Sequence, residues 1–271
     1  MTASLMRRWG LVRDGPAFAS FTGSRVLPVR SGRVRAVLKI GSDRRAAREE
    51  AAALAAWAGD GAVPLLRRDA ARGALLLGRA VPGRTLAQAM AAATPPDPIA
   101  VSGEVLRRLS RPGAAARPRG DVPPLAALAR RWAGALPRDW ARTGRPCPSA
   151  WIDAALSALE VLSAGAPSPP VLLHLDLHGG NLVEDRRHGW RAIDPMPALG
   201  DPAFAPAPVV RAFEHGHSRW AAIRRLDRSA EALNVDRERA RLWSFAQTLA
   251  WAMRSDWRDR HLQTVGWLLE A

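Results

Sequence analysis

The first third of the chain combines short apolar runs with one alanine-rich stretch. Two of the runs flank Ser31-Gly32, which predicts a pair of strands joined by a tight turn. Ser42-Asp43 then precedes the alanine-rich residues 44–58, a pattern typical of a helix with a polar N-terminal cap. The strand-like runs of this third cover residues 24–30, 33–40, 62–66 and 73–77.

The rest of the chain is mainly helical after a break at Val81-Pro82-Gly83. Apolar positions recur there at helical spacing, whereas residues 111–124 are rich in Pro, Gly and Ala and are expected to form a surface loop. The predicted helices cover 85–93, 100–109, 125–136, 150–163 and the region from around residue 218 onward. Shorter strand-like runs cover 171–174, 182–183 and 190–193.

Strands first and helices afterwards predict an α+β fold rather than alternating βαβ units. We expect two lobes, a small strand-rich N-terminal lobe over residues 1–80 and a larger, mainly helical C-terminal lobe over 81–271, with a hinge near 78–83. Four tryptophans of the last segment have a spacing that suits core packing. They are Trp220, Trp243, Trp251 and Trp267.

Composition and length exclude several classes of protein. The single cysteine, Cys147, rules out an internal disulfide and a thiolate zinc cluster. No apolar run approaches the roughly 20 residues that span a bilayer, and residues 1–10 lack the apolar stretch of a secretory signal. We therefore expect a cytoplasmic protein with no membrane partner.

The formal net charge of +15 raises the question of nucleic-acid binding. However, only Lys39 among the 40 basic residues is a lysine, there is no tyrosine, and Asn181 and Asn234 are the only asparagines. Because these residue types need A/T-rich codons, the composition indicates a G+C-rich genome that inflates arginine. The arginines are also scattered, so nucleic-acid binding is not indicated as the main function. The rare residues Lys39 and Asn181 draw attention instead.

Asn181 lies in the densest polar cluster, the segment His174-Leu175-Asp176-Leu177-His178-Gly179-Gly180-Asn181. Asp176 and Asn181 are five positions apart on a glycine-containing loop between apolar strands, and a later strand leads to Asp194. Phosphoryl transfer from Mg-ATP needs a carboxylate that orients the attacking hydroxyl and hard oxygen ligands for Mg²⁺. The spacing predicts Asp176 in the first role, and Asn181 and Asp194 as metal ligands.

Lys39, in the strand-like Val37-Leu38-Lys39-Ile40, fits the cation that contacts the phosphates of ATP. Its ion-pair partner is expected on the next helix, where Glu50 is the better candidate and Glu49 the fallback. Further nucleotide contacts are predicted at Gly23, in the short loop 20–24, and at Leu77 and Arg79, which flank the start of the hinge.

Residues 172–204 resemble the aminoglycoside and hydroxyurea phosphotransferase family, and most of all its streptomycin 6-phosphotransferase branch. The shared motifs are His174-x-Asp176-x-His178-x-x-Asn181, Ala192-Ile193-Asp194-Pro195 and Gly200-Asp201-Pro202-Ala203-Phe204. The likeness extends upstream to residues 37–39, 50–54 and 74–77, so it covers most of the chain from about Trp9, with residues 111–170 matching only in general character. The resemblance implies a protein-kinase-like fold, ATP in the cleft between the lobes, and a hydroxylated small-molecule acceptor such as streptomycin or hydroxyurea. It also implies a role in antibiotic resistance.

The polar residues near these motifs are expected to have different roles. His174 is expected to orient the catalytic loop, His178 either to do so or to move protons, and Asp201 to hold a turn. Gly78 and Ala205 depart from the family pattern, in which acidic residues are common. Carboxylates that could receive a cationic acceptor are Glu214, Asp227, Glu231, Asp256 and Asp259.

Two alternatives remain open at this point. A non-catalytic, kinase-shaped protein would keep nucleotide binding and lose turnover through the departures at Gly78 and Ala205. A metal-dependent hydrolase would use His174, Asp176 and His178 as ligands, with His215 and His217 added. The hydrolase does not account for Lys39, Asn181 and Asp194, so the kinase explains more of the chain.

Overall fold

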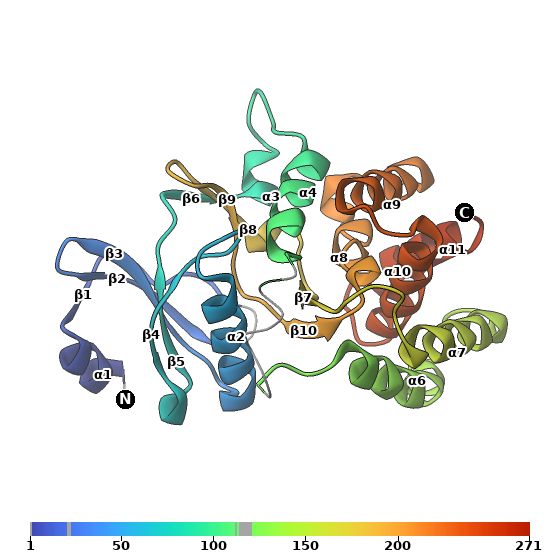
Figure 1. Cartoon of the computed structure of the whole chain (residues 1–271), viewed down its shortest axis with the longest axis horizontal. Coiled ribbons are helices and arrows are strands. Elements are labelled where there is room, and N and C mark those ends of the chain that lie inside the picture. The colour runs from blue at the N-terminus through green and yellow to red at the C-terminus, as the bar shows by residue number, and fades with distance from the viewer. Residues whose placement is uncertain (1, 21–22, 112, 114–120) are drawn as a thin grey trace.

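The computed structural model describes residues 2–20, 23–111, 113 and 121–271. Its strands and helices are segregated as expected for an α+β fold, with a sheet at the N-terminal end and a helical lobe at the other end (Figure 1). The N-terminal elements are α1 (Thr2–Trp9), β1 (Leu11–Arg13), β2 (Arg25–Ser31), β3 (Val34–Ile40), α2 (Arg44–Trp57), β4 (Leu65–Asp69), η1 (Ala70–Arg72) and β5 (Ala74–Gly78).

The N-terminal sheet is antiparallel, with the described strands in the order β1-β2-β3-β5-β4. Strand β2 pairs with β3 from Arg25↔Ile40 to Ser31↔Val34, which confirms the predicted hairpin but places its turn at residues 32–33, one position after Ser31-Gly32. Successive side chains of β3 point to opposite faces. Leu38 and Ile40 pack with Leu5 of α1 on one face. Lys39 therefore points to the other face, where α2 lies.

Helix α2 connects the sheet to the rest of the molecule. The Asp43 side chain accepts hydrogen bonds from the main-chain N–H groups of Arg45 and Ala46, as the sequence predicts for a cap. Small alanines let the helix approach the sheet closely, and Glu50 is buried on its inner face. At its end, the Trp57 indole N–H donates to the carbonyl of Leu109 over 3.0 Å. The helix is thereby fixed to the C-terminal lobe.

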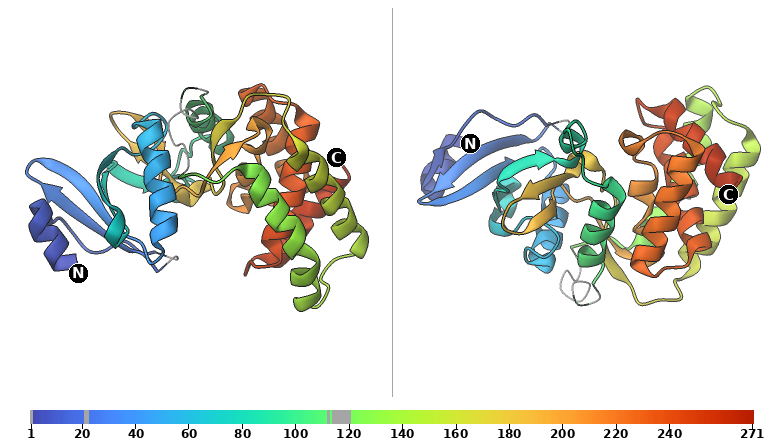
Figure 2. Two further views of the ribbon diagram at one scale, coloured as in Figure 1. Left: turned by 60° about the horizontal axis from the view of Figure 1, so that its bottom comes forward. Right: turned by 90° about the horizontal axis from the view of Figure 1, so that it is seen from above.

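The C-terminal lobe begins with a small sheet, ordered β6-β8-β9, and a β10-β7 pair that together lie between the N-terminal sheet and the helices (Figure 2). Its elements are β6 (Pro82–Thr85), α3 (Leu86–Ala89), α4 (Pro98–Leu109), α6 (Leu125–Arg142), α7 (Ser149–Ala164), β7 (Val171–His174), η2 (Gly179–Asn181), β8 (Leu182–Asp185), β9 (Gly189–Ala192), β10 (Pro197–Gly200), η3 (Pro202–Phe204), α8 (Ala207–Val210), η4 (Phe213–His215), α9 (Arg219–Leu233), α10 (Arg237–Ala252) and α11 (Arg258–Leu269).

Helix α10 is the centre of the helical lobe, packing against α6, α7, α8, α9 and α11. Trp243 on this helix is buried, and its indole N–H donates to Asp201 over 2.7 Å, so Asp201 has the structural role expected of it. Trp251 and Trp267 are half-buried. Trp220 corrects the core prediction, because it is 70% exposed on the surface of α9, where the Arg224 guanidinium lies 5.2 Å from its ring centroid.

Most of the predicted elements are present, with differences at their ends. The helix expected over 85–93 is only the short α3, and no local pattern indicated α1, β1, β6 or β10. Most of the loop predicted at 111–124, and residues 21–22 of the predicted loop 20–24, lie outside the described residues. Within the described ranges, no helix is long and apolar enough to cross a membrane. The proposed division at residue 80 remains a prediction.

The two departures from the family pattern both fit tightly packed positions. Gly78 lies against the ring of Pro64, where an added Cβ would come within 2.6 Å of the Pro64 Cγ atom. Ala205 is buried, and the turn before it is held by the Asp201 carboxylate, which accepts a hydrogen bond from the Ala203 N–H over 3.0 Å. Gly78 therefore has no room for a larger side chain, and Ala205 is part of the packed core.

Replacing Gly78 by Ala should lower the free energy of unfolding by about 1–3 kcal/mol, because the added methyl group overpacks the Pro64 contact. Gly134 is the matched control, since it is exposed within α6 and a methyl group added there would meet nothing within 4 Å. Gly134→Ala should raise the same free energy by roughly 0.5–1 kcal/mol. Urea denaturation of the two variants measures both effects, and equal stabilities would contradict this account of Gly78.

Candidate active site

The side chain of Lys39 is buried where β3 faces α2. Its ammonium donates to Glu50 Oε2 over 2.6 Å, whereas Glu49 pairs with Arg45 at the surface. The structure therefore favours Glu50 over Glu49 as the partner. Burial alone would lower the pKa of Lys39, but the carboxylates of Glu50 and Asp194 outweigh it and raise that pKa above its ordinary value. Burial raises the pKa of Glu50 to about 7, against the opposing effect of Lys39.

Asp194 reaches the same ammonium from the C-terminal lobe. Its Oδ1 atom accepts from Lys39 Nζ over 2.5 Å, and its side chain is 44% exposed. The residue follows β9 in a left-handed conformation with φ 54°, which costs energy for a non-glycine residue and is common at functional sites. Next to it, the Ile193 N–H donates to the carbonyl of Asn181 over 2.9 Å. This bond connects the Asp194 turn to the loop that carries Asn181.

The loop after β7 carries Asp176 and Asn181. The Asn181 amide donates from Nδ2 to the main-chain carbonyl of Asp176 over 2.9 Å, which ties the two ends of the loop together. With Nδ2 so engaged, the amide oxygen is the atom left for a metal ion. That oxygen and the Asp194 carboxylate are hard donors of the kind that Mg²⁺ prefers, so the residues present fit the ion.

His174 holds this loop against the Asp194 turn. Its Nε2 atom lies 3.0 Å from the Ile193 carbonyl, and its Nδ1 atom accepts from the Asp176 N–H over 3.3 Å. The ring stacks on Trp57 of α2, with centroids 6.3 Å apart. Burial lowers the pKa of His174 to about 4, so the ring is neutral near pH 7. Both nitrogens face protein groups, which supports the orienting role and leaves neither for a hydrolase metal.

Three further polar residues support the loop and were not predicted as its partners. Arg211 donates from Nη2 to Asp176 Oδ1 over 2.8 Å. Gln247 on α10 in turn accepts from Arg211 over 2.7 Å. Glu214 accepts from the Gly179 N–H over 2.8 Å, so this candidate for an acceptor carboxylate supports the loop itself. A charged residue inside the apolar run Val209-Val210-Arg211-Ala212-Phe213 is the sequence signal that could have indicated Arg211.

His178 also belongs to the loop. Its Nδ1 atom accepts from the Gly180 N–H over 3.1 Å and caps η2, while its Nε2 atom lies 3.8 Å from Asp176 Oδ2. Of the remaining acceptor candidates, Asp227 pairs with Arg237 and Glu231 lies 3.9 Å from Arg228. His178 thus has one nitrogen in a structural hydrogen bond, and its side chain as a whole is 41% exposed.

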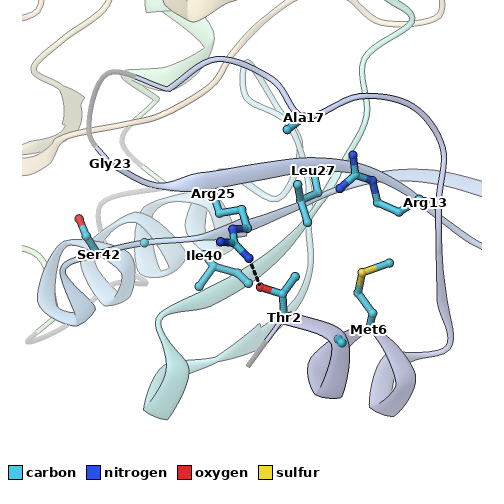
Figure 3. A pocket seen from close by; sticks show the side chains of 11 residues that line it. Thr2, Met6, Arg13, Ala17, Gly23, Arg25, Leu27, Ile40 and Ser42 are labelled. Carbon is cyan, nitrogen blue, oxygen red and sulfur yellow. Dashed lines mark hydrogen bonds between the residues drawn. The ribbon is translucent and has the colours of Figure 1, made fainter.

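The other predicted nucleotide contacts are not gathered around Lys39 in the same way. Leu77 is buried opposite Val37 in the sheet register, and the Arg79 guanidinium pairs with Asp14 over 2.9 Å. Gly23 lines a pocket of about 900 Å³ that α1 and β2 border (Figure 3). Leu27 and Ile40 also line it, so it lies on the face of the sheet opposite Lys39. The nucleotide roles of Gly23, Leu77 and Arg79 stay predictions.

A buried strand lysine, its helix glutamate, an aspartate from a second lobe and an Asp-x-x-x-x-Asn loop together define a class, the kinase-like phosphotransferases. The sequence pattern of the aminoglycoside/hydroxyurea antibiotic resistance kinases matches residues 8–260, and the chain belongs to this family. The metal-dependent hydrolase considered from the sequence is therefore wrong.

Individual relatives agree with this assignment. The chain is 34% identical over 261 residues to a streptomycin 6-kinase of Streptomyces glaucescens, covering 92% of this chain and 80% of the relative. It is also 34% identical over 254 residues to a hydroxyurea phosphotransferase of Kitasatospora aureofaciens, covering 91% and 70%. Among solved structures, a mutant of the aminoglycoside phosphotransferase APH(4)-Ia in complex with AMP-PNP and hygromycin B superposes with a TM-score of 0.71 at 17% identity, covering 99% and 96%. This likeness confirms the kinase-like fold.

Stability should depend on pH through His261, which is buried on α11 with its Nδ1 atom unpaired among the described residues. Burial, together with Arg211 and His217, lowers the pKa of His261 to about 4, from 6.5. The unfolded chain therefore binds the proton first as the pH falls, and the contribution of the neutral ring, present above pH 6.5, is lost toward pH 4. Between pH 7 and pH 4.5 this amounts to about 2 kcal/mol.

His261→Leu should remove that part of the pH dependence, as measured by urea denaturation at the two pH values. The comparison with the wild type is needed because the raised pKa of Glu50 acts with the opposite sign between pH 4.5 and about 7. An unchanged difference between the two pH values in His261→Leu would show that His261 does not titrate as described.

Proposed function

We propose that this protein transfers the γ-phosphoryl group of ATP to a hydroxyl group of a small molecule, with Asp176 orienting that hydroxyl. The observation that carries the proposal is the contact between lobes, in which Lys39 Nζ lies 2.5 Å from Asp194 Oδ1. A cation suited to phosphates and a carboxylate suited to Mg²⁺ thereby meet at one point, beside the loop of Asp176 and Asn181.

Each residue has a definite task in this proposal. Lys39, held by Glu50, binds phosphate oxygens of the nucleotide. Asn181 and Asp194 would hold Mg²⁺, which when bound neutralises negative charge on the phosphates. Asp176 accepts a hydrogen bond from the acceptor hydroxyl, takes its proton and aims its oxygen at the phosphorus atom. His174 keeps the two loops in register through the Ile193 carbonyl and the Asp176 N–H.

The acceptor is proposed from the relatives. Streptomycin and hydroxyurea are the compounds named for two relatives that share 34% of their residues with this chain over most of its length. Each offers a hydroxyl group, so either fits the same transfer, which we place in the cytoplasm and associate with antibiotic resistance. Both belong in the first panel of acceptors.

Asp194→Asn should abolish the stabilisation by Mg-ATP, because it removes a charged metal ligand. In the wild type, a 100-fold excess of Mg-ATP over its Kd should raise Tm by roughly 5–10 °C. Asp176→Asn should keep that shift and lose about 10²- to 10⁴-fold in acceptor-dependent ADP formation, since it removes only the base. Differential scanning fluorimetry and a coupled ADP assay with streptomycin and with hydroxyurea measure the two effects.

Glu238→Gln is the matched control, because this exposed carboxylate pairs with Arg241 within α10. It should change neither the Tm shift nor ADP formation. If the wild type is stabilised by Mg-ATP but forms no ADP with any hydroxylated acceptor, the protein is instead the non-catalytic nucleotide binder considered from the sequence. Full activity of Asp176→Asn would refute the role of Asp176.

A further inference from the structure

Arg211 makes the closest described contact to the carboxylate of Asp176. The guanidinium donates from Nη2 to Asp176 Oδ1 over 2.8 Å and to the carbonyl of Leu175 over 3.3 Å. One nitrogen thus binds the side chain of Asp176 and the main chain immediately before it. A group bonded to both limits rotation of the carboxylate about its side-chain torsions.

Arg211 is itself held on its other sides. Its Nη1 atom donates to Gln247 Oε1 over 2.7 Å, and its guanidinium carbon lies 4.4 Å from the ring centroid of Trp251. Gln247 and Trp251 both belong to α10, the central helix of the lobe. Because Arg211 is 5% exposed and Gln247 1% exposed, water competes little for these bonds.

This arrangement treats the two oxygens of Asp176 differently. Oδ1 is occupied by Arg211, whereas Oδ2 lies 3.8 Å from His178 Nε2, beyond direct hydrogen-bond distance. Oδ2 is therefore the oxygen left to receive an acceptor hydroxyl. A carboxylate fixed through one oxygen presents the other in one direction, which favours a productive geometry for attack.

The charge of Arg211 is consistent with this role. Burial lowers the pKa of Arg211 and the Asp176 carboxylate opposes that effect, but an arginine remains protonated at neutral pH. A buried ion pair contributes little net stability on average, because desolvation offsets the attraction. The pair is thus better explained by orientation of Asp176 than by stabilisation of the fold.

We propose that Arg211 is a positioning residue that fixes Asp176 through Oδ1, and that Gln247 acts through Arg211. The proposal rests on the phosphotransfer proposed above. It adds a chain of three residues, from helix α10 to the base, that the motif around Asp176 does not contain.

The first test compares Arg211→Met with Arg211→Lys and with a matched control. Arg239→Met is that control, because Arg239 forms another largely buried pair in the same lobe, with Asp201. Arg211→Met should lower kcat for ADP formation roughly 10- to 100-fold while the KM for ATP changes less than about threefold. Arg211→Lys should recover part of kcat, since its ammonium can replace some of the bonds. Arg239→Met should lower Tm without this fall in kcat.

The second test asks whether Gln247 acts through Arg211. Gln247→Leu alone should lower kcat, and adding it to Arg211→Met should lower kcat no further. Independent effects that multiply in the double variant would overturn the relay from Gln247. An Arg211→Met enzyme with the kcat of the wild type, or an equal loss of kcat in Arg239→Met, would overturn the positioning role.

A third measurement does not depend on activity, so it separates this inference from the proposed function. Melting temperatures are compared for Arg211→Met, Asp176→Asn and the double variant. The pairing predicts that the double variant falls by less than the sum of the two single shifts, and additive shifts would contradict it. If the wild type forms no ADP with streptomycin, hydroxyurea or water as acceptor, the phosphotransfer fails, and the pairing is judged by the melting temperatures alone.

Discussion

The buried ammonium of Lys39 is the constraint on which the two lobes depend. A lone charge in this position would be strongly unfavourable, and it is tolerated because carboxylates reach it from two sides, Glu50 on α2 and Asp194 after β9. Three separate elements must therefore arrive at one point. The alternation of β3 turns Lys39 away from α1, and the phase of α2 turns Glu50 inward. The left-handed turn at Asp194 brings the third group from the other lobe.

A second layer of polar groups supports the loop of Asp176 and Asn181. Arg225 is fully buried and donates to the carbonyls of Val210, His215 and Gly216, so it fixes the segment that carries Arg211 and Glu214. Those two residues then bind Asp176 and the Gly179 N–H. The loop itself contains two glycines, and Leu175 and Leu177 anchor it in the apolar core. Its polar groups are held in addition by hydrogen bonds from a segment about 35 positions further along the chain.

The sequence predicted the parts of the fold and site that depend on local pattern. Alternation indicated the hairpin of β2 and β3, the cap at Asp43 indicated the start of α2, and the rarity of lysine drew attention to Lys39. The same compositional bias concealed Arg211, because one arginine among so many carries no signal by its type alone. Trp220 was assigned to the core because its spacing was read without the orientation of α9. Short elements such as β1 and β10 are defined by pairing with distant strands, so local pattern could not reveal them.

The same difference separates the groups proposed to bind phosphate and metal from the side chains of the helices around them. The groups proposed to bind phosphate and metal are a cation and hard oxygen donors, and short motifs encode them. The cluster of Phe213, Trp257 and Arg260, by contrast, is assembled from η4 and the start of α11. No sequence motif defines this cluster, because its side chains come from separate elements of the fold. In the proposed function, Arg211 would fix Asp176 in the same way whichever hydroxylated acceptor is bound.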